Sequence, residues 1–319
     1  MSLYLVLLLY FPLFLLPISK GGALLGFKLV LVILYSVFLF LHIDAGPDHV
    51  IYKWAYEQPF GVVLFEPFYL LLTMISKFLG FSYYDFLIFL RSINCLLFSI
   101  FVFKVDKLKL LFFLSLYIPI SFLTFELNLL RQSLAIHICF LSILAYMNGK
   151  LKLSLVFFVL AICSHFSSLI LVFLYLNRVN KLILIFCFSM LLSIVFPFLI
   201  DKVIAYQSIG GLEFRSGIFM IQLGLLLLIP FFIFSFPGGA YSIFLYATIC
   251  LLSFIPVLVR LYPLALLLIA PFALYKYNNR FVIYFLLIIS FFMCVVKTNL
   301  LISADNFAIK EGIYEKGYQ

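Results

Sequence analysis

Four arginines stand within or at the ends of strongly apolar stretches of this 319-residue chain, at positions Arg91, Arg131, Arg215 and Arg260. A charged side chain at the centre of a bilayer costs about 2.5–3.5 kcal/mol on insertion scales, so it usually faces a wet cavity or a counter-charge. The guanidinium group presents its donors in a fork that matches phosphate oxygens. We therefore predict that these arginines bind a diphosphate, whose negative charge grows as it departs from a reacting carbon.

A second set of residues could move protons. Asp44 and Asp48 flank a Gly-Pro turn, and Glu66 and His165 interrupt long apolar stretches. Carboxylates and histidine are common general bases, which take the proton of a reacting hydroxyl group. We predict Asp48, Glu66 and His165 as catalytic residues. The structural alternatives are an ion pair for Glu66 and a hydrogen-bonded position for His165.

A third set could contact a sugar, namely Asp44, Tyr52 and Glu126. Tyr52 follows Asp48 at helical spacing, which predicts a short helix in the plane of the membrane surface. The alternatives are a helix cap for Asp44, an interfacial anchor for Tyr52 and an ion-pair partner for Glu126. The partner of Glu126 would be Arg131, because a cation at a helix N-terminus opposes the helix dipole and calls for a nearby anion.

The composition decides which class of protein must position these residues. The chain is 67% hydrophobic and only 10% charged, against about 25% charged in soluble domains. It is therefore an integral membrane protein, which excludes soluble enzymes and disordered chains. The net charge of +9 indicates basic cytoplasmic loops rather than nucleic-acid binding. Neither a tight Asp-x-Asp pair nor a His/Cys cluster is present, so we predict no metal and no cofactor.

Apolar stretches of helical length predict an all-α polytopic membrane protein with about 11–13 transmembrane helices in a single domain, 1–319. The stretches are 3–18, 27–43, 62–79, 85–103, 108–124, 130–147, 152–176, 182–200, 216–236, 240–259, 261–275 and 281–299. For all the basic loops to lie on one side of the membrane, two of these stretches cannot each form a single spanning helix. We expect 152–176 to form two short helices that meet near His165. We expect 62–79 to be re-entrant or to lie along the outer face, with a helix start at Pro67.

With this arrangement, the basic clusters and the acidic residues lie mostly on opposite sides of the membrane. The basic clusters around residues 20–28, 104–109, 150–152, 178–181 and 276–280 lie in the cytoplasm by the positive-inside rule. Every acidic residue except Asp106 falls on the opposite side. Since the acidic residues were not used to choose the orientation, their position indicates that the chemistry takes place on the outer face.

Four short motifs in series resemble one known family. They are Asp-x3-Asp-x3-Tyr at 44–52, Phe-Glu-Pro-Phe-Tyr-x-Leu at 65–71, Leu-Arg-Gln-x-Leu-Ala at 130–135 and His-Phe-Ser-Ser-Leu-Ile at 165–170. In this order they resemble the EpsG-type branch of the Wzy family, which are repeat-unit polymerases of bacterial surface polysaccharides. The Glu-Pro pair departs from the Glu-Gly that the family pattern has there.

The resemblance implies a GT-C-like glycosyltransferase in the bacterial inner membrane, multi-pass, with its site facing the periplasm or the cell exterior. Its substrate would be an undecaprenyl-diphosphate-linked oligosaccharide, and its partners membrane lipid and a chain-length regulator protein, with no nucleic acid. The matched positions are Asp44, Asp48, Glu66, Arg131 and His165, with Arg260 a less secure match. Two other functions remain open, a flippase or transporter of lipid-linked sugar and an O-antigen ligase-like glycosyltransferase.

Overall fold

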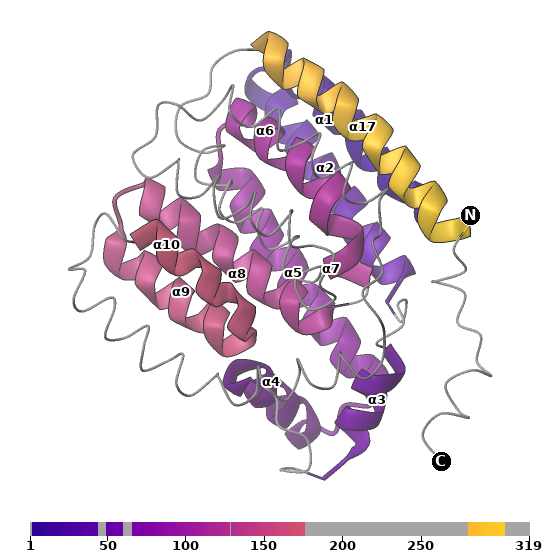
Figure 1. Ribbon diagram of the computed structural model, residues 1–319, viewed down its shortest axis with the longest axis vertical. Coiled ribbons are helices and arrows are strands. Elements are labelled where there is room, and N and C mark those ends of the chain that lie inside the picture. Colours follow the sequence, from indigo (N-terminus) through magenta and orange to yellow (C-terminus); the bar gives the residue numbers. More distant parts are fainter. Residues whose placement is uncertain (1, 44–48, 60–65, 128, 176–279, 304–319) are drawn as a thin grey trace, which may run out of the picture. The chain divides into compact units, whose positions relative to one another are not determined.

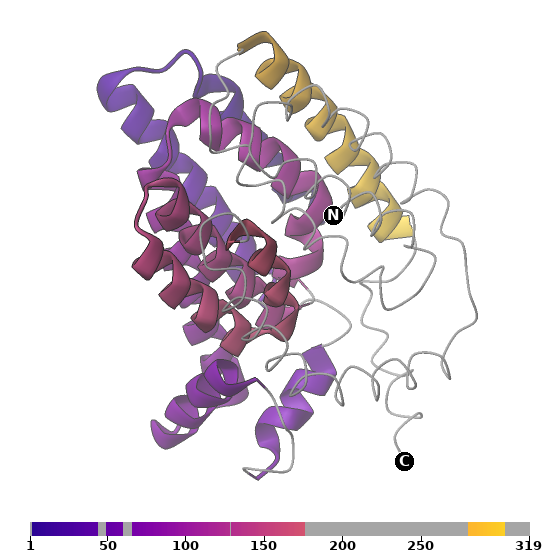
Figure 2. The same cartoon turned by 60° about the vertical axis from the view of Figure 1, so that its left-hand side comes forward.

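The computed structural model describes residues 2–43, 49–59, 66–127, 129–175 and 280–303, and every regular element in these ranges is a helix (Figure 1, Figure 2). The chain divides into two compact units, residues 1–134 with 279–319 and residues 135–278. That residues 1–319 form a single transmembrane domain stays a prediction. Four predicted site residues, Asp44, Asp48, Arg215 and Arg260, lie outside the described residues.

Within the described ranges, four helices are long and apolar enough to cross a membrane. They are α2 (Gly21–Leu41), α5 (Tyr83–Lys104), the continuous helix Lys107–Leu127 and α8 (Leu130–Met147). Each coincides with a predicted apolar stretch, which confirms an all-helical membrane protein at this level. The full count of about 11–13 transmembrane helices stays a prediction.

The first unit is a helical bundle held by aromatic packing. Helix α2 lies against α5, where the Tyr35 ring stacks on Phe98 with centroids 4.0 Å apart and meets Phe122 at 5.7 Å. The yellow helix α17 (Arg280–Ser303) lies along α6, and the Tyr10 hydroxyl donates to the Ser290 carbonyl at 3.0 Å (Figure 1). The other N-terminal helices are η1 (Ser2–Leu9) and α1 (Tyr10–Leu15).

The helix Lys107–Leu127 changes its winding in the middle. Its segments are α6 (Lys107–Tyr117), the π-helical turn η2 (Ile118–Phe122) and α7 (Leu123–Leu127). Pro119 lies in the π turn and has no N–H to donate, which disturbs the regular helical hydrogen bonds. The ammonium of Lys297 in α17 donates to the Ile120 carbonyl at 2.7 Å, so a cation from another helix stabilises the irregular turn.

Two short helices connect α2 to α5. Helix α3 (His49–Glu57) forms where a short helix was predicted, and α4 (Pro67–Phe78) starts at Pro67 as expected. At about 1.5 Å per residue, the 12 residues of α4 reach about 18 Å, less than the roughly 30 Å of a bilayer core. Helix α4 alone is therefore too short to cross. A re-entrant or an in-plane position for 62–79 stays a prediction.

The second unit contains an antiparallel hairpin made of the rest of α8 and α9 (Leu151–Ser164). Its turn uses Gly149 at φ +75°, a backbone conformation that glycine adopts without strain. Ser142, Ser154 and the Tyr175 hydroxyl are mutually hydrogen bonded between the helices at 2.6–3.4 Å. Beyond α9 come η3 (Phe166–Leu171) and α10 (Val172–Tyr175). The predicted break at His165 is confirmed, because this residue is extended between α9 and η3.

Candidate functional site

The N-terminal ends of α4 and α8 meet through an ion pair. The guanidinium of Arg131, in the first turn of α8, donates a hydrogen bond to the carboxylate of Glu66, the N-cap residue of α4. The carboxylate occupies the end of α4 that favours an anion. The Glu66 side chain is 3% exposed and that of Arg131 is 17% exposed. The carboxylate is therefore covered, while the cation keeps one accessible edge.

Tyr52 of α3 covers another side of the same guanidinium. The Arg131 Nε–H group donates to the Tyr52 hydroxyl at 3.5 Å, and the guanidinium carbon lies 5.6 Å from the centroid of the tyrosine ring. The Tyr52 ring in turn lies against Tyr69 of α4, with centroids 6.2 Å apart. Arg131 is thus held in one orientation by a carboxylate and an aromatic face from two different helices.

This arrangement gives Arg131 the anionic partner that its place at a helix N-terminus requires, and that partner is Glu66. Sequence proximity favoured Glu126, five residues before Arg131. Both carboxylate oxygens of Glu126 instead accept hydrogen bonds inside the bundle, from the Tyr117 hydroxyl and the Ser133 hydroxyl, each at 2.7 Å. Glu66 therefore forms the ion pair that was the structural alternative for it, and its predicted catalytic role stays a prediction.

Glu126 belongs to a second polar cluster that connects α5, α6, α7 and α8. Arg91 approaches it with an N–O distance of 3.7 Å, and the amide of Asn94 donates to the Ser133 hydroxyl at 2.7 Å. The side chains of Arg91 and Glu126 are both 0% exposed. None of the three guanidinium nitrogens of Arg91 has a hydrogen-bond partner in the part of the chain that the structure describes. The cluster is therefore sealed, and its charges compensate each other.

The sealed cluster has a direct structural connection to the first ion pair. Ser133, which donates to Glu126, stands two residues after Arg131 in the first turn of α8. The cluster therefore fixes the helix end that carries Arg131. Sequence reasoning missed Tyr117, Ser133 and Asn94. The spacing of Arg91 and Asn94, three residues apart on one helix face, is the signal that could have indicated a polar cluster.

His165 lies in the second unit and is the N-cap residue of η3. Its Nδ1 atom accepts from the Ser167 backbone N–H at 3.1 Å and lies 2.6 Å from the Ser167 hydroxyl. Because Nδ1 accepts a backbone hydrogen bond, the proton of the neutral ring must be on Nε2. In this conformation the neutral ring can donate a hydrogen bond from Nε2, and the catalytic role of His165 stays a prediction.

Comparison with known proteins adds one finding. The model of the EpsG family matches residues 26–311, a segment that includes Glu66, Arg131 and His165. No curated protein and no solved structure matches the chain. The family match agrees with the resemblance that the four sequence motifs indicated. The chain belongs to the EpsG family, which makes it a polymerase-like membrane protein of polysaccharide biosynthesis.

Proposed function

We propose that this protein is a membrane glycosyltransferase that polymerises undecaprenyl-diphosphate-linked oligosaccharide repeat units at the periplasmic face of the bacterial inner membrane. The product would be an O-antigen or a similar surface polysaccharide, made in a GT-C-like helical bundle. The observation that carries the proposal is the partly exposed Arg131, held between Glu66 and Tyr52 at the ends of two helices.

The diphosphate of the donor competes with Glu66 for Arg131. A diphosphate carries more negative charge than one carboxylate and matches the donor fork of a guanidinium. The 17% exposure of the Arg131 side chain gives such an anion access. When the diphosphate binds the guanidinium, Glu66 loses its counter-charge and becomes a stronger base. Substrate binding would thus prepare the carboxylate of Glu66 to accept the hydroxyl proton in the transfer step.

In the transfer step, a hydroxyl oxygen at the nonreducing end of the acceptor unit attacks the anomeric carbon of the donor chain. The bond from that carbon to the diphosphate oxygen breaks, and undecaprenyl diphosphate leaves with the electron pair. The hydroxyl proton passes to the carboxylate of Glu66 or Asp48. Arg131 stabilises the charge that grows on the diphosphate. His165 stays a proposed catalytic residue in its own unit, with the family match over residues 26–311 as its support.

The test is complementation of a polymerase-null strain with variants expressed at equal membrane levels. We expect Arg131→Gln, Glu66→Gln and His165→Ala each to abolish long glycan chains and to leave single-repeat products. The charge swap Glu66→Arg with Arg131→Glu restores an ion pair but reverses its direction, so it should not restore polymer. Lys53→Gln, which removes an exposed cation from α3, is the matched control and should give normal polymer.

Other outcomes contradict the proposal in recognisable ways. If the charge swap restores long chains, the ion pair acts only in folding. If the deletion strain accumulates long polymer on the carrier lipid, the protein is a ligase. If it loses all outer glycan, the protein is a flippase or transporter.

A further inference from the structure

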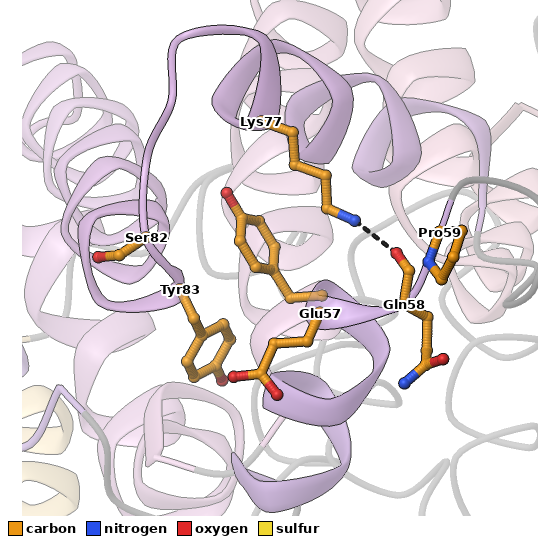
Figure 3. A pocket seen from close by; sticks show the side chains of 7 residues that line it. Glu57, Gln58, Pro59, Lys77, Ser82 and Tyr83 are labelled. Atoms are coloured by element: carbon orange, nitrogen blue, oxygen red, sulfur yellow. Dashed lines mark hydrogen bonds between the residues drawn. The ribbon is translucent and has the colours of Figure 1, made fainter.

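An open pocket lies in the first unit at the C-terminal end of α3 and the start of α5. Its volume is about 590 Å³, within the roughly 300–1,000 Å³ of small-molecule sites. The lining residues are Tyr56, Glu57, Gln58, Pro59, Lys77, Ser82 and Tyr83. Figure 3 shows Glu57, Gln58, Lys77 and Tyr83 around the same space. None of the predicted site residues that the structure describes lines it.

The pocket has a rigid aromatic wall. The hydroxyl of Tyr56 donates to the Phe81 carbonyl at 2.9 Å, and its ring stacks on Phe86 with centroids 5.0 Å apart. The Tyr83 ring lies 5.7 Å from that of Tyr56. Both tyrosine side chains are largely buried in the protein, so their rings are fixed before any ligand arrives. Aromatic faces of this kind offer apolar contact area at little entropic cost.

The charges at the rim favour a neutral ligand over an anion. The Lys77 ammonium is engaged by the Gln58 carbonyl at 2.7 Å and lies 5.2 Å from the centroid of the Tyr56 ring. Figure 3 shows this hydrogen bond as a dashed line across the pocket. The carboxylate of Glu57 is exposed at the opening and repels an anion. Together with the Gln58 amide it offers acceptors and donors to hydroxyl groups.

The pocket lies at one end of a helix that is long enough to span a membrane. Tyr83 is the first residue of α5, one of the four helices long enough to span a bilayer, so this end of α5 lies near the boundary with water. Ser82 begins the helix with a capping box to Asp85, a pattern of exposed helix ends. A water-soluble part of a lipid-linked molecule can therefore reach the pocket.

Helix α3 also joins the pocket to the Glu66–Arg131 pair. Tyr52 contacts Arg131, and Tyr56 lines the pocket one helical turn further on, about 6 Å along the axis. The rings of Tyr52, Tyr69, Phe86 and Tyr56 follow one another with centroid distances of 6.2, 5.7 and 5.0 Å. A ligand with one charged and one uncharged part fits such a pair of neighbouring sites.

We propose that the pocket at Glu57, Gln58 and Tyr83 is a neutral-sugar subsite, which holds sugar rings of an oligosaccharide repeat unit next to the Glu66–Arg131 pair. The Tyr83 ring contacts the C–H face of a pyranose ring. Tyr56, whose own ring already stacks on Phe86 and lies under the Lys77 ammonium, supports that wall of the pocket. Glu57 and Gln58 hydrogen bond to its hydroxyl groups. This inference rests on the proposed function for the choice of oligosaccharide, but the binding itself requires neither a diphosphate nor a reaction.

The experiment measures binding of the lipid-free repeat-unit oligosaccharide, released from its carrier by mild acid, to the full-length protein in nanodiscs. Trp54 of α3 is the only tryptophan and is 53% exposed, and its carbonyl accepts from the backbone N–H of the pocket residue Gln58, so its fluorescence is one readout of ligand binding. Saturation-transfer NMR provides a second readout. We expect saturable binding to the wild-type protein that inorganic pyrophosphate does not displace.

The double variant Glu57→Ala with Gln58→Ala should bind at least about tenfold more weakly, because it removes two hydrogen-bonding side chains. Both are at least partly exposed, so the fold should survive. Lys53→Ala, on the same helix outside the pocket, and Arg131→Gln should bind as wild type does. Unchanged binding by the double variant, loss of binding by Arg131→Gln, or no binding by wild type each overturns the subsite. Failure of the proposed polymerase function would appear separately, in the glycan products of Arg131→Gln cells.

Discussion

The buried Arg91–Glu126 pair allows a quantitative prediction about which arginines serve structure and which serve chemistry. Both side chains are 0% exposed, and the N–O distance is 3.7 Å. At about 1.5 Å per residue, Arg91 lies about 12 Å along α5 from Tyr83. We predict that Arg91 acts by compensating Glu126 and not by contact with a diphosphate.

Removal of one charge from this pair leaves the other buried without compensation, which costs about 3–5 kcal/mol. We therefore expect Glu126→Gln to lower the free energy of unfolding by about that amount. The guanidinium of Arg91 would then have no carboxylate beside it, and it already lacks hydrogen bonds from the described residues. Arg91→Met should lower the free energy of unfolding by about 3 kcal/mol, at the lower end of that range, because Tyr117 and Ser133 still donate hydrogen bonds to the carboxylate of Glu126.

The double variant Arg91→Met with Glu126→Gln should be more stable than the sum of the single changes predicts. It removes both charges and keeps a carbonyl oxygen that accepts from Tyr117 or Ser133. We expect a coupling energy of about 2–3 kcal/mol. The assay is unfolding by SDS in mixed micelles, followed by Trp54 fluorescence, with glycan analysis of the same variants in a polymerase-null strain.

Two results would refute this interpretation. Additive single effects would mean that Arg91 and Glu126 do not compensate each other. A double variant that is stable but produces no long polymer would mean that Arg91 contacts the donor, as its sequence position first indicated. A stable double variant with normal polymer assigns Arg91 to the fold.

Three further predictions concern single positions. Gly149→Ala should lower stability by about 1–2 kcal/mol, because its backbone φ of +75° is strained for a residue with a Cβ atom. Gly26→Ala, inside α2 and with no atom within 4 Å of the added Cβ, should instead raise stability by about 0.5–1 kcal/mol. Thermal unfolding in detergent compares the two variants. His165→Asn keeps a side-chain acceptor for the N-terminus of η3, so it should preserve the melting temperature while abolishing polymer. Lys297→Met removes the hydrogen bond from the ammonium to the Ile120 carbonyl and should lower stability by about 1–3 kcal/mol in the same assay, with no change in the size of the polymer made by the folded fraction.

The positions of helices followed from the sequence because apolar length and backbone chemistry are local properties. Pro67 starts α4 because proline lacks the N–H that a helix interior needs and fits the first turn. The break at His165 followed from the basic loops, since 152–176 must cross the membrane twice if the clusters at 150–152 and 178–181 both lie in the cytoplasm. Both features follow from residues in or directly beside the segment concerned.

The partners of the charged residues could not be predicted in the same way. Arg131 lies five residues from Glu126 and 65 from Glu66, yet Glu66 is the carboxylate that accepts its hydrogen bond. Ser133 donates to Glu126, which already pairs with Arg91. Which carboxylate meets which arginine depends on how α4, α5 and α8 pack, and residue spacing within one helix carries no information about that packing.

Among its described residues, the first unit therefore contains two arginine–glutamate pairs of the same chemistry with different access to solvent. The Arg91–Glu126 pair is closed, at 0% exposure for both side chains, and other buried side chains satisfy the Glu126 carboxylate. The Arg131–Glu66 pair has a covered carboxylate and a cation that is 17% exposed. An incoming anion can compete only for a cation that it can reach without opening the bundle. Of these two described arginines, access rather than charge or residue type is therefore our reason to propose Arg131 as the one that exchanges its carboxylate for a diphosphate, while the closed pair keeps the first turn of α8 in place.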